Sequence, residues 1–274
     1  MIPLAIALSS AAVAQTTLER LKEENIVRVG VANEKPYGYL QADGTLSGEG
    51  PAIARQILSG IDPDLRLEGV VTRFEALIPE LQAGGYDIMA AGMFITPQRC
   101  QEVAFSNPTY RVGQAFAVQA GNPKGLTDYK TAAQHPDARL GFMAGAVEYI
   151  YATEAGLLGA DRSKLYPDPQ AALEGLRQGE VDAVALSALA IQNLVADAEN
   201  LEATAQFFPV VDGKPVRGYG AFAFRKDDQD LVEAFNRRLA EFIGTEQHRQ
   251  IMERFGFTPA MEPDRTAEEL CQGR

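Results

Sequence analysis

Short extended segments alternate with helical segments through the first third of the chain. Each extended segment is rich in β-branched and apolar residues, and each helical segment spaces its apolar residues by three or four positions. The expected strands cover residues 26–32, 65–72 and 87–92, and the expected helices cover residues 51–58 and 74–83. This order predicts an α/β fold in which parallel sheets are covered by helices.

A second series of the same kind follows in the middle of the chain. Its strands are expected near residue 140, near residue 165 and at 181–186, and its helices at residues 147–155, 169–178 and 188–196. Neither series accounts for all 274 residues. Two α/β lobes, each with its own core, are therefore the natural division.

Two longer extended segments flank the second series. Residues 110–119 end in the turn signal Ala-Gly-Asn-Pro, and residues 219–225 match them further along the chain. Two strands that cross between the lobes would form a hinge, after which helices at 229–243 and 246–255 return to the first lobe. We expect a first lobe of residues 15–114 and 221–274, and a second lobe of residues 115–220.

The first residues have the features of a secretory signal. Residues 2–14 are apolar and small, and they end on Ala12-Val13-Ala14, which has the A-x-A form that signal peptidase cleaves. We expect residues 1–14 to be removed, which leaves a periplasmic protein beginning near Gln15. The segment is too short to span a bilayer, and no cysteine follows it as a site for a lipid anchor.

The net charge of −12 excludes two classes of partner. It repels the phosphates of nucleic acids and the surface of anionic membranes, and no basic cluster offsets it locally. The sequence also lacks the P-loop, the dinucleotide fingerprint, the Gly-x-Ser-x-Gly elbow and the His-Glu-x-x-His motif. His135 and His248 stand in polar surroundings, and no Cys/His pairs have metal-ligand spacing. We expect a monomer without metal or cofactor.

Cys100 and Cys271 are the two cysteines of the chain. An even number of cysteines in an oxidising compartment favours one disulfide. Two unpaired buried thiols are the alternative. A disulfide would connect the end of the chain to its first half.

Aromatic and charged residues follow the strands of the first series. They are Glu34 and Tyr37 after the first strand, Phe74 after the second, and Gly92, Phe94 and Arg99 after the third. Ligands of open α/β sheets bind beyond the carboxyl ends of the strands. Aromatic rings beside a carboxylate attract a delocalised cation, and a guanidinium forks onto a carboxylate. The set predicts a site for a zwitterion, although singly each aromatic residue fits a core position and each charge a surface position.

Several motifs resemble those of one known family. They are residues 32–37 (Ala-Asn-Glu-Lys-Pro-Tyr), 74–84 (Phe-Glu-Ala-Leu-Ile-Pro-Glu-Leu-Gln-Ala-Gly), 87, 97–100 (Pro-Gln-Arg-Cys) and 179–183 (Gly-Glu-Val-Asp-Ala). In these motifs the sequence is similar to the amino-acid-type solute-binding proteins of ABC importers. Residues 91–100 and the late Leu270-Cys271 most resemble the ectoine and 5-hydroxyectoine binders. The resemblance implies a type II periplasmic-binding-protein fold, with two lobes joined by a two-strand hinge.

The resemblance also implies roles for particular residues. In the ectoine binders an aromatic box encloses the amidinium ring, an acidic residue bonds its N–H groups, and an arginine holds the carboxylate. By position, Tyr37, Phe74 and Phe94 match the box, Glu34 the acid and Arg99 the clamp. The pairing of Cys100 with Cys271 is likewise similar to the pattern of the family.

Two segments of the second lobe depart from the usual pattern. The loop that often reads Gly-Thr has Gly145, Ala146 and Val147, so it keeps backbone N–H donors but has no hydroxyl. Glu148, which follows, is interpreted as a capping charge at a helix start. Ser187 stands where many amino-acid binders carry an aspartate for the α-ammonium group, which disfavours an ordinary α-amino acid because its charge would be buried unpaired.

The sequence therefore favours the periplasmic solute-binding component of an ABC importer, which delivers its ligand to membrane subunits. The expected ligand is a small zwitterionic compatible solute, ectoine or 5-hydroxyectoine, while a related solute, a betaine or a polar amino acid stays open. The rival is an enzyme similar to the cyclohexadienyl dehydratases, with Glu34 or Glu148 as general acid. Because no paired acid and base supports that reading, we expect no enzyme activity.

Overall fold

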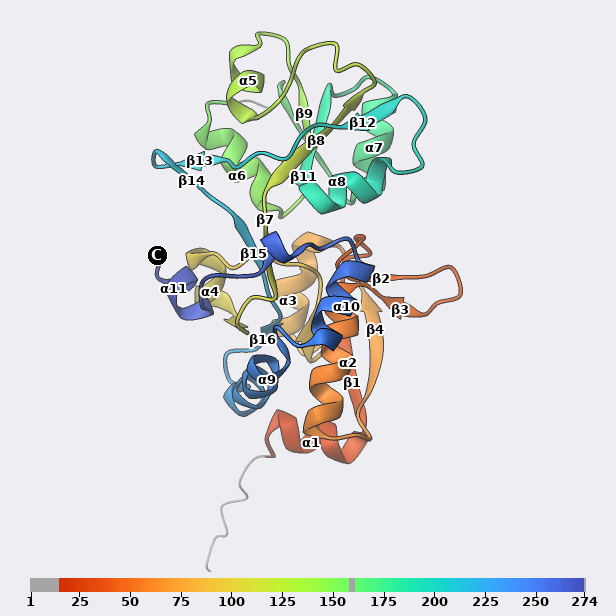
Figure 1. Ribbon diagram of the computed structural model, residues 1–274, viewed down its shortest axis with the longest axis vertical. Coiled ribbons are helices and arrows are strands. Elements are labelled where there is room, and N and C mark those ends of the chain that lie inside the picture. The colour runs from red at the N-terminus through yellow and green to blue at the C-terminus, as the bar shows by residue number, and fades with distance from the viewer. Residues whose placement is uncertain (1–14, 158–160, 274) are drawn as a thin grey trace, which may run out of the picture.

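The structure, a computed structural model, describes residues 15–157 and 161–273. It consists of two α/β lobes, one above the other in Figure 1, and each lobe is built on a five-stranded sheet. The α/β fold with two lobes is thus the one that the sequence predicts. The expected signal peptide, residues 1–14, lies outside the described residues.

The first lobe contains a sheet in the order β4-β1-β5-β16-β6. Its strands are β1 (Ile26–Val31), β4 (Arg66–Val71), β5 (Ile88–Met89), β6 (Ala104–Phe105) and β16 (Ala223–Phe224). β1 runs parallel to β4 and β5, whereas β16 pairs antiparallel with β5 and β6. The expected parallel pairing therefore holds for β1, β4 and β5 but not for β16, because the chain that returns from the second lobe enters this sheet in the opposite direction.

Helices pack around the first sheet because each has one apolar face. In α2, Ile53, Ala54, Ile57 and Leu58 recur at helical spacing and are buried. The helices of this lobe are α1 (Thr17–Glu24), α2 (Glu49–Ile61), η1 (Phe74–Ala76), α3 (Leu77–Gln82), α4 (Pro97–Glu102), α9 (Gln229–Phe242), α10 (Glu246–Arg254), η2 (Pro259–Met261) and α11 (Ala267–Cys271). A hairpin of β2 (Tyr39–Leu40) and β3 (Leu46–Ser47) extends beside them. Within the described residues no helix is long and apolar enough to cross a membrane.

The second lobe repeats this plan with the strand order β10-β9-β11-β8-β12. Its strands are β8 (Gln114–Gln119), β9 (Leu140–Met143), β10 (Ser163–Tyr166), β11 (Ala183–Ser187) and β12 (Leu201–Ala203), and its helices are α5 (Tyr129–Gln134), α6 (Val147–Glu154), α7 (Pro169–Arg177) and α8 (Ala188–Val195). β9 runs parallel to β10 and β11, while β8 pairs antiparallel with β11 and β12. A small hairpin of β13 (Val210–Val211) and β14 (Lys214–Pro215) projects from the side of this lobe (Figure 1).

Two antiparallel strands connect the lobes. They are β7 (Tyr110–Val112) and β15 (Gly218–Gly220), and Figure 1 shows them between the two sheets. The predicted single run over residues 110–119 is in fact two strands, because Gly113 separates β7 from β8. The chain thus crosses between the lobes at the two segments expected to form the hinge, while the exact lobe boundaries stay a prediction.

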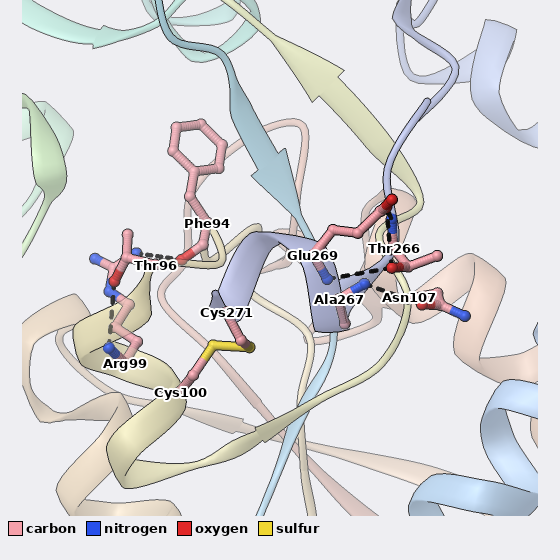
Figure 2. The surroundings of a disulfide bond; sticks show 9 residues. All are labelled: Phe94, Thr96, Arg99, Cys100, Asn107, Thr266, Ala267, Glu269 and Cys271. Carbon is pink, nitrogen blue, oxygen red and sulfur yellow. Dashed lines mark hydrogen bonds between the residues drawn. A yellow bond between two sulfur atoms is a disulfide. The ribbon is translucent and has the colours of Figure 1, made fainter. Parts of the chain in front are cut away.

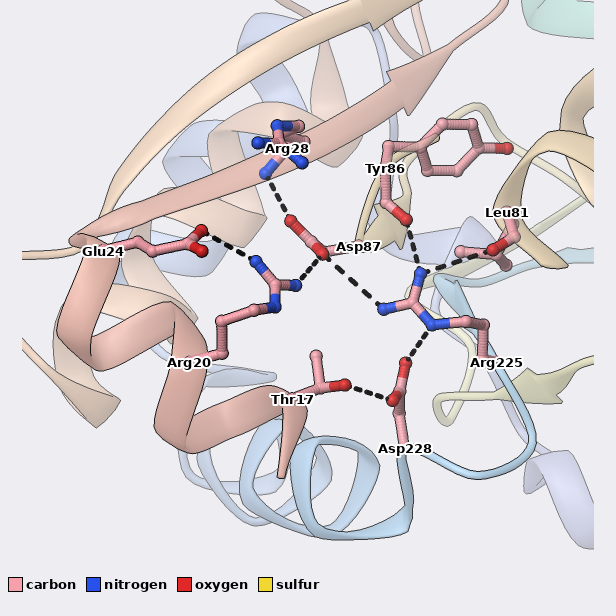
Figure 3. Close-up of polar contacts among 9 residues, drawn as sticks. All are labelled: Thr17, Arg20, Glu24, Arg28, Leu81, Tyr86, Asp87, Arg225 and Asp228. Atoms are coloured by element: carbon pink, nitrogen blue, oxygen red, sulfur yellow. Dashed lines mark hydrogen bonds and ion pairs between the residues drawn. The ribbon is translucent and has the colours of Figure 1, made fainter. Parts of the chain in front are cut away.

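A buried ion network joins the N-terminal helix to the first sheet (Figure 3). The carboxylate of Asp87, 3% exposed, contacts the guanidinium of Arg20 from α1 and lies 3.6 Å from that of Arg225. It also accepts a hydrogen bond of 2.9 Å from the backbone N–H of Arg28 on β1. Nε of Arg225 forms a second ion pair of 2.9 Å with Asp228, just before α9. The network therefore fixes α1, β1 and the returning chain at one end of the lobe.

A disulfide between Cys100 and Cys271 joins α4 to α11, with the two Cα atoms 5.7 Å apart. Figure 2 shows that it lies beside the residue that the sequence predicts as the carboxylate clamp, Arg99. At the start of α4, Oγ1 of Thr96 accepts a hydrogen bond of 3.2 Å from the backbone N–H of Arg99 and caps the helix. The short helix that carries Arg99 is therefore capped at its start and tied to α11 by the residue that follows Arg99.

Candidate ligand site between the lobes

Residues from both lobes line a small cavity with about 290 Å³ of empty space. The first lobe contributes Glu34, Tyr37, Phe74, Gly92, Phe94 and Arg99, and the second contributes Met143, Ala146, Val147, Glu148, Leu186 and Ser187. The structure thus brings together all of the predicted ligand-binding residues, with Gly145 placed against Arg99 rather than in the cavity wall.

Tyr37 and Ser187 connect the lobes across the cavity. The Tyr37 hydroxyl and the Ser187 Oγ are 2.5 Å apart, and the same Oγ accepts a hydrogen bond from the N–H of Ala190 as the N-cap of α8. The Tyr37 ring stacks on Tyr110 with centroids 5.3 Å apart. Gly92 has a φ of +68°, and a Cβ there would lie 2.4 Å from the Tyr37 ring. Gly92 therefore acts by giving room to Tyr37.

Arg99 also contacts both lobes. Its Nη1 donates to the carbonyl of Phe94 at 2.8 Å, and its Nη2 donates to the carbonyl of Gly145 in the second lobe at 3.0 Å. Its other side-chain N–H groups have no acceptor among the described residues. Burial lowers the pKa of Arg99 to about 10, so the side chain stays a cation at neutral pH. It can give its remaining donors to an anion in the cavity.

Phe74 and Phe94 place aromatic surface on the first-lobe side of the cavity. The Phe74 ring lies 5.7 Å from Cζ of Arg99. The Phe94 ring lies against Gly218 of β15, where a Cβ would come within 2.2 Å of the ring. They are 7% and 6% exposed, so each ring packs in the core and also lines the cavity.

Glu34 places an unpaired carboxyl group in the cavity wall. The residue is 6% exposed, and its carboxyl group makes no hydrogen bond or ion pair with any described residue. Burial and the neighbouring Glu148 raise its pKa to about 8. A ligand cation placed here would compensate for the hydration that the Glu34 carboxylate loses on burial, and would stabilise its charged form.

Glu148 supplies a second buried acid, from the first turn of α6. The residue is 4% exposed, and its Oε1 accepts a hydrogen bond of 3.3 Å from Nε2 of Gln114. Tyr129 donates in turn to Oε1 of Gln114, which fixes the orientation of the amide. Burial raises the pKa of Glu148 to about 7, against the lowering effects of its own backbone N–H and of Arg99.

The predicted set of ligand-binding residues omits three residues of the cavity wall, which are Met143, Glu148 and Leu186. The interpretation of Glu148 as a capping charge is incomplete, because its position in the first turn of α6 also turns its carboxyl group to the cavity. Met143 ends β9 and Leu186 lies near the end of β11. The end of a parallel strand is the signal that could have identified them. The described residues include no cluster of His, Cys, Asp and Glu able to hold a metal ion.

This two-lobed fold, with a cavity between the lobes, matches one protein family. The model of the bacterial extracellular solute-binding proteins, family 3, matches residues 27–258. The chain belongs to this family. It is accordingly a solute-binding protein of an ABC transporter, a receptor that binds its ligand for transport and is not an enzyme.

Several relatives agree with this assignment. The chain is 34% identical over 274 residues to a probable amino-acid ABC transporter periplasmic-binding protein, y4tE, of Sinorhizobium fredii. This match covers 98% of this chain and 90% of the relative. It is 29% identical over 179 residues to the lysine/arginine/ornithine-binding periplasmic protein of Escherichia coli, covering 63% and 65%. The crystal structure of EhuB in complex with hydroxyectoine is similar, with a TM-score of 0.84 and 38% identity, covering 94% of this chain and 98% of that one.

Proposed function

We propose that this family member is a periplasmic receptor for ectoine or 5-hydroxyectoine. One observation carries the proposal. A cavity lined by aromatic rings contains both the buried carboxyl group of Glu34, which has no partner among the described residues, and the buried guanidinium of Arg99. Such a cavity suits a small zwitterion whose cation is delocalised. The similarity to a structure that holds hydroxyectoine supports this choice.

The cationic end of the ligand lies against Glu34. An amidinium ring offers N–H donors to the carboxylate and a flat, weakly hydrated face to Tyr37, Phe74 and Phe94. Each ring that faces a cation contributes about 0.5 to 2 kcal/mol, with the larger values in desolvated sites. A compact ammonium group would use the ring faces less well, because it is strongly hydrated.

The carboxylate of the ligand lies against Arg99 and the start of α6. The guanidinium has donors left after its contacts with Phe94 and Gly145. The backbone N–H groups at the start of α6 are further donors to an anion, as at other helix N-termini. Both ends of the zwitterion are then paired, which a buried charge requires.

Closure of the lobes completes the site. The contacts Tyr37 to Ser187 and Arg99 to Gly145 both cross from one lobe to the other. The ligand would favour this closed arrangement in proportion to its greater affinity for it, with β7 and β15 as the hinge. The closed receptor then delivers the solute to the membrane subunits of its importer.

A receptor for a polar amino acid is the second candidate, favoured by relatives such as the lysine/arginine/ornithine binder. Ser187 disfavours it. The Ser187 Oγ is already engaged with Tyr37 and the N-terminus of α8, so this position holds no carboxylate for an α-ammonium group.

A thermal-shift screen of the mature protein tests the proposal. The panel contains ectoine, 5-hydroxyectoine, glycine betaine, proline, arginine, glutamate and prephenate. Stabilisation by the two ectoines above all other compounds is the expected result, since a ligand at 100 times its Kd adds about 2.7 kcal/mol to the free energy of unfolding. Stabilisation by a standard amino acid and not by the ectoines would overturn the ligand.

A further inference from the structure

The cavity contains more negative than positive charge. Among the described residues that line it, Glu34 and Glu148 are acids and Arg99 is the one cation. With all three ionised, the wall carries a charge of −1. A zwitterion adds no net charge, so the closed complex would bury an uncompensated negative charge, which is costly in a low dielectric.

A ligand affects the two acids in opposite ways. Glu34 faces the cation in the proposed complex, and this cation stabilises its charged form. Glu148 follows directly on the segment that contacts Arg99, where the ligand carboxylate is expected. A second anion there destabilises the charged form of Glu148, so the excess charge is removed at Glu148.

The surroundings of Glu148 fit a neutral acid. Oε1 accepts the hydrogen bond from Gln114 at 3.3 Å, and the backbone N–H of Glu148 is a further donor to the carboxyl group. Since the side chain lines the cavity, a proton on the carboxyl group can be donated to a ligand there. The other titratable groups around it are Tyr129 on α5, Tyr151 on α6, and Tyr37, Glu34 and Arg99 from the first lobe. Burial raises the pKa values of these tyrosines, which are therefore neutral at physiological pH.

We propose that Glu148 binds the ligand as a neutral carboxylic acid, which donates its O–H to the ligand carboxylate, so that closure of the lobes takes up one proton from solvent. This inference rests on the proposed function. It makes Glu148 a determinant of specificity, since a neutral acid accepts a carboxylate that an ionised one would repel. Arg99 and Glu148 then share the anion, one as a cation and the other as a neutral donor.

Affinity should depend on pH with a definite sign. The ligand carboxylate raises the pKa of Glu148 in the complex above its value in the free protein. The affinity that depends on Glu148 is therefore highest below the pKa of Glu148 in the free protein, and it falls as the pH rises through that pKa. Burial raises the pKa of Glu148 to about 7, whereas Glu34, whose pKa of about 8 the ligand cation lowers, releases a proton on binding below about pH 8. Above about pH 8 only Glu148 contributes, and the Kd should rise there by up to about tenfold per pH unit.

Isothermal titration of the mature protein with 5-hydroxyectoine tests the inference. The titration is done at several pH values between about pH 6 and about pH 9, where neither charged group of the ligand titrates, and in buffers of different ionisation enthalpy. The expected result is an uptake approaching one proton per ligand above about pH 8, where Glu34 is already ionised before the ligand binds. Binding with no proton uptake and a constant Kd above about pH 8 would overturn the inference and leave the proposed ligand standing. No binding at any pH would instead overturn the proposed function.

Variants locate the proton. Glu148→Gln keeps a neutral donor at the same place and should abolish the proton uptake above about pH 8, while the proton release from Glu34 at lower pH is retained. Glu148→Ala has no donor and should weaken binding by about tenfold or more below neutral pH. Glu154→Gln removes the same charge from an exposed position on the same helix and should retain the proton uptake. Uptake that persists in Glu148→Gln would contradict the assignment of the proton to Glu148.

Discussion

Replacing Arg99 by alanine should weaken binding of either ectoine by a large factor. Arg99 is 9% exposed, and its guanidinium already donates to two protein carbonyl groups, at 2.8 and 3.0 Å, so little water can replace it as a partner of the ligand carboxylate. Removal of one partner of a buried charge pair costs about 2 to 5 kcal/mol. This corresponds to a loss of affinity of roughly 30-fold to several thousandfold.

The fold should survive this substitution. The variant loses two hydrogen bonds to carbonyl groups, each worth about 1 kcal/mol, but it also relieves the desolvation of a buried cation. Thermal unfolding without ligand should therefore shift by only a few degrees. Calorimetric titration with 5-hydroxyectoine measures the affinity, and circular dichroism follows the fold.

A matched control distinguishes the direct contact of Arg99 with the ligand from the effect of removing any positive charge from this lobe. Arg73 immediately precedes η1, and its side chain is 70% exposed. Arg73→Ala removes the same charge beside the same lobe and should change the Kd by less than about threefold, because an exposed charge contributes little. If Arg99→Ala binds as tightly as Arg73→Ala, the reasoning about the clamp is refuted.

Three further predictions concern the box, the contact between the lobes and the disulfide. Phe94→Ala should weaken binding of ectoine by at least about 1 kcal/mol through lost ring contact and cation attraction, and an unchanged Kd in a titration would assign Phe94 to the core alone. Tyr37→Phe keeps the ring stacked on Tyr110 but removes the bond to Ser187, so the Kd should rise by about threefold to tenfold; an equal or lower Kd would show that this bond does not favour closure. The double substitution Cys100→Ser and Cys271→Ser removes a disulfide that joins residues 171 positions apart. It should lower the free energy of unfolding by about 2 to 5 kcal/mol in denaturant titrations, and an unchanged midpoint would contradict this prediction.

The parts of the fold that the sequence predicts are those with a strong local pattern. The β-branched segment before Ala32 is β1, and the apolar spacing from residue 229 onward is α9. The short strands β6 and β16 have two residues each, too few to show a period. Their antiparallel pairing depends on the return of the chain through the hinge, which local patterns do not describe.

The candidate site likewise contains residues that local sequence patterns could predict and residues that they could not. Glu34, Phe74 and Arg99 follow strands or open helices, so their meeting could be predicted from the rule for strand ends. The partner of the Tyr37 hydroxyl could not be predicted, because Ser187 lies 150 residues away on the other lobe. Glu148 has the sequence signature of a capping residue, and only the packing of α6 against the first lobe shows that it faces the cavity.

The central claim is that the cavity holds an ectoine with its cation at Glu34 and its carboxylate at Arg99. A crystal structure of the mature protein grown with 5-hydroxyectoine tests it most directly. The account predicts the amidinium ring among Tyr37, Phe74 and Phe94, with the ligand carboxylate in hydrogen-bonding contact with the Arg99 guanidinium. A reversed ligand, or a closed cavity that has retained an amino acid and excluded 5-hydroxyectoine, would contradict the account.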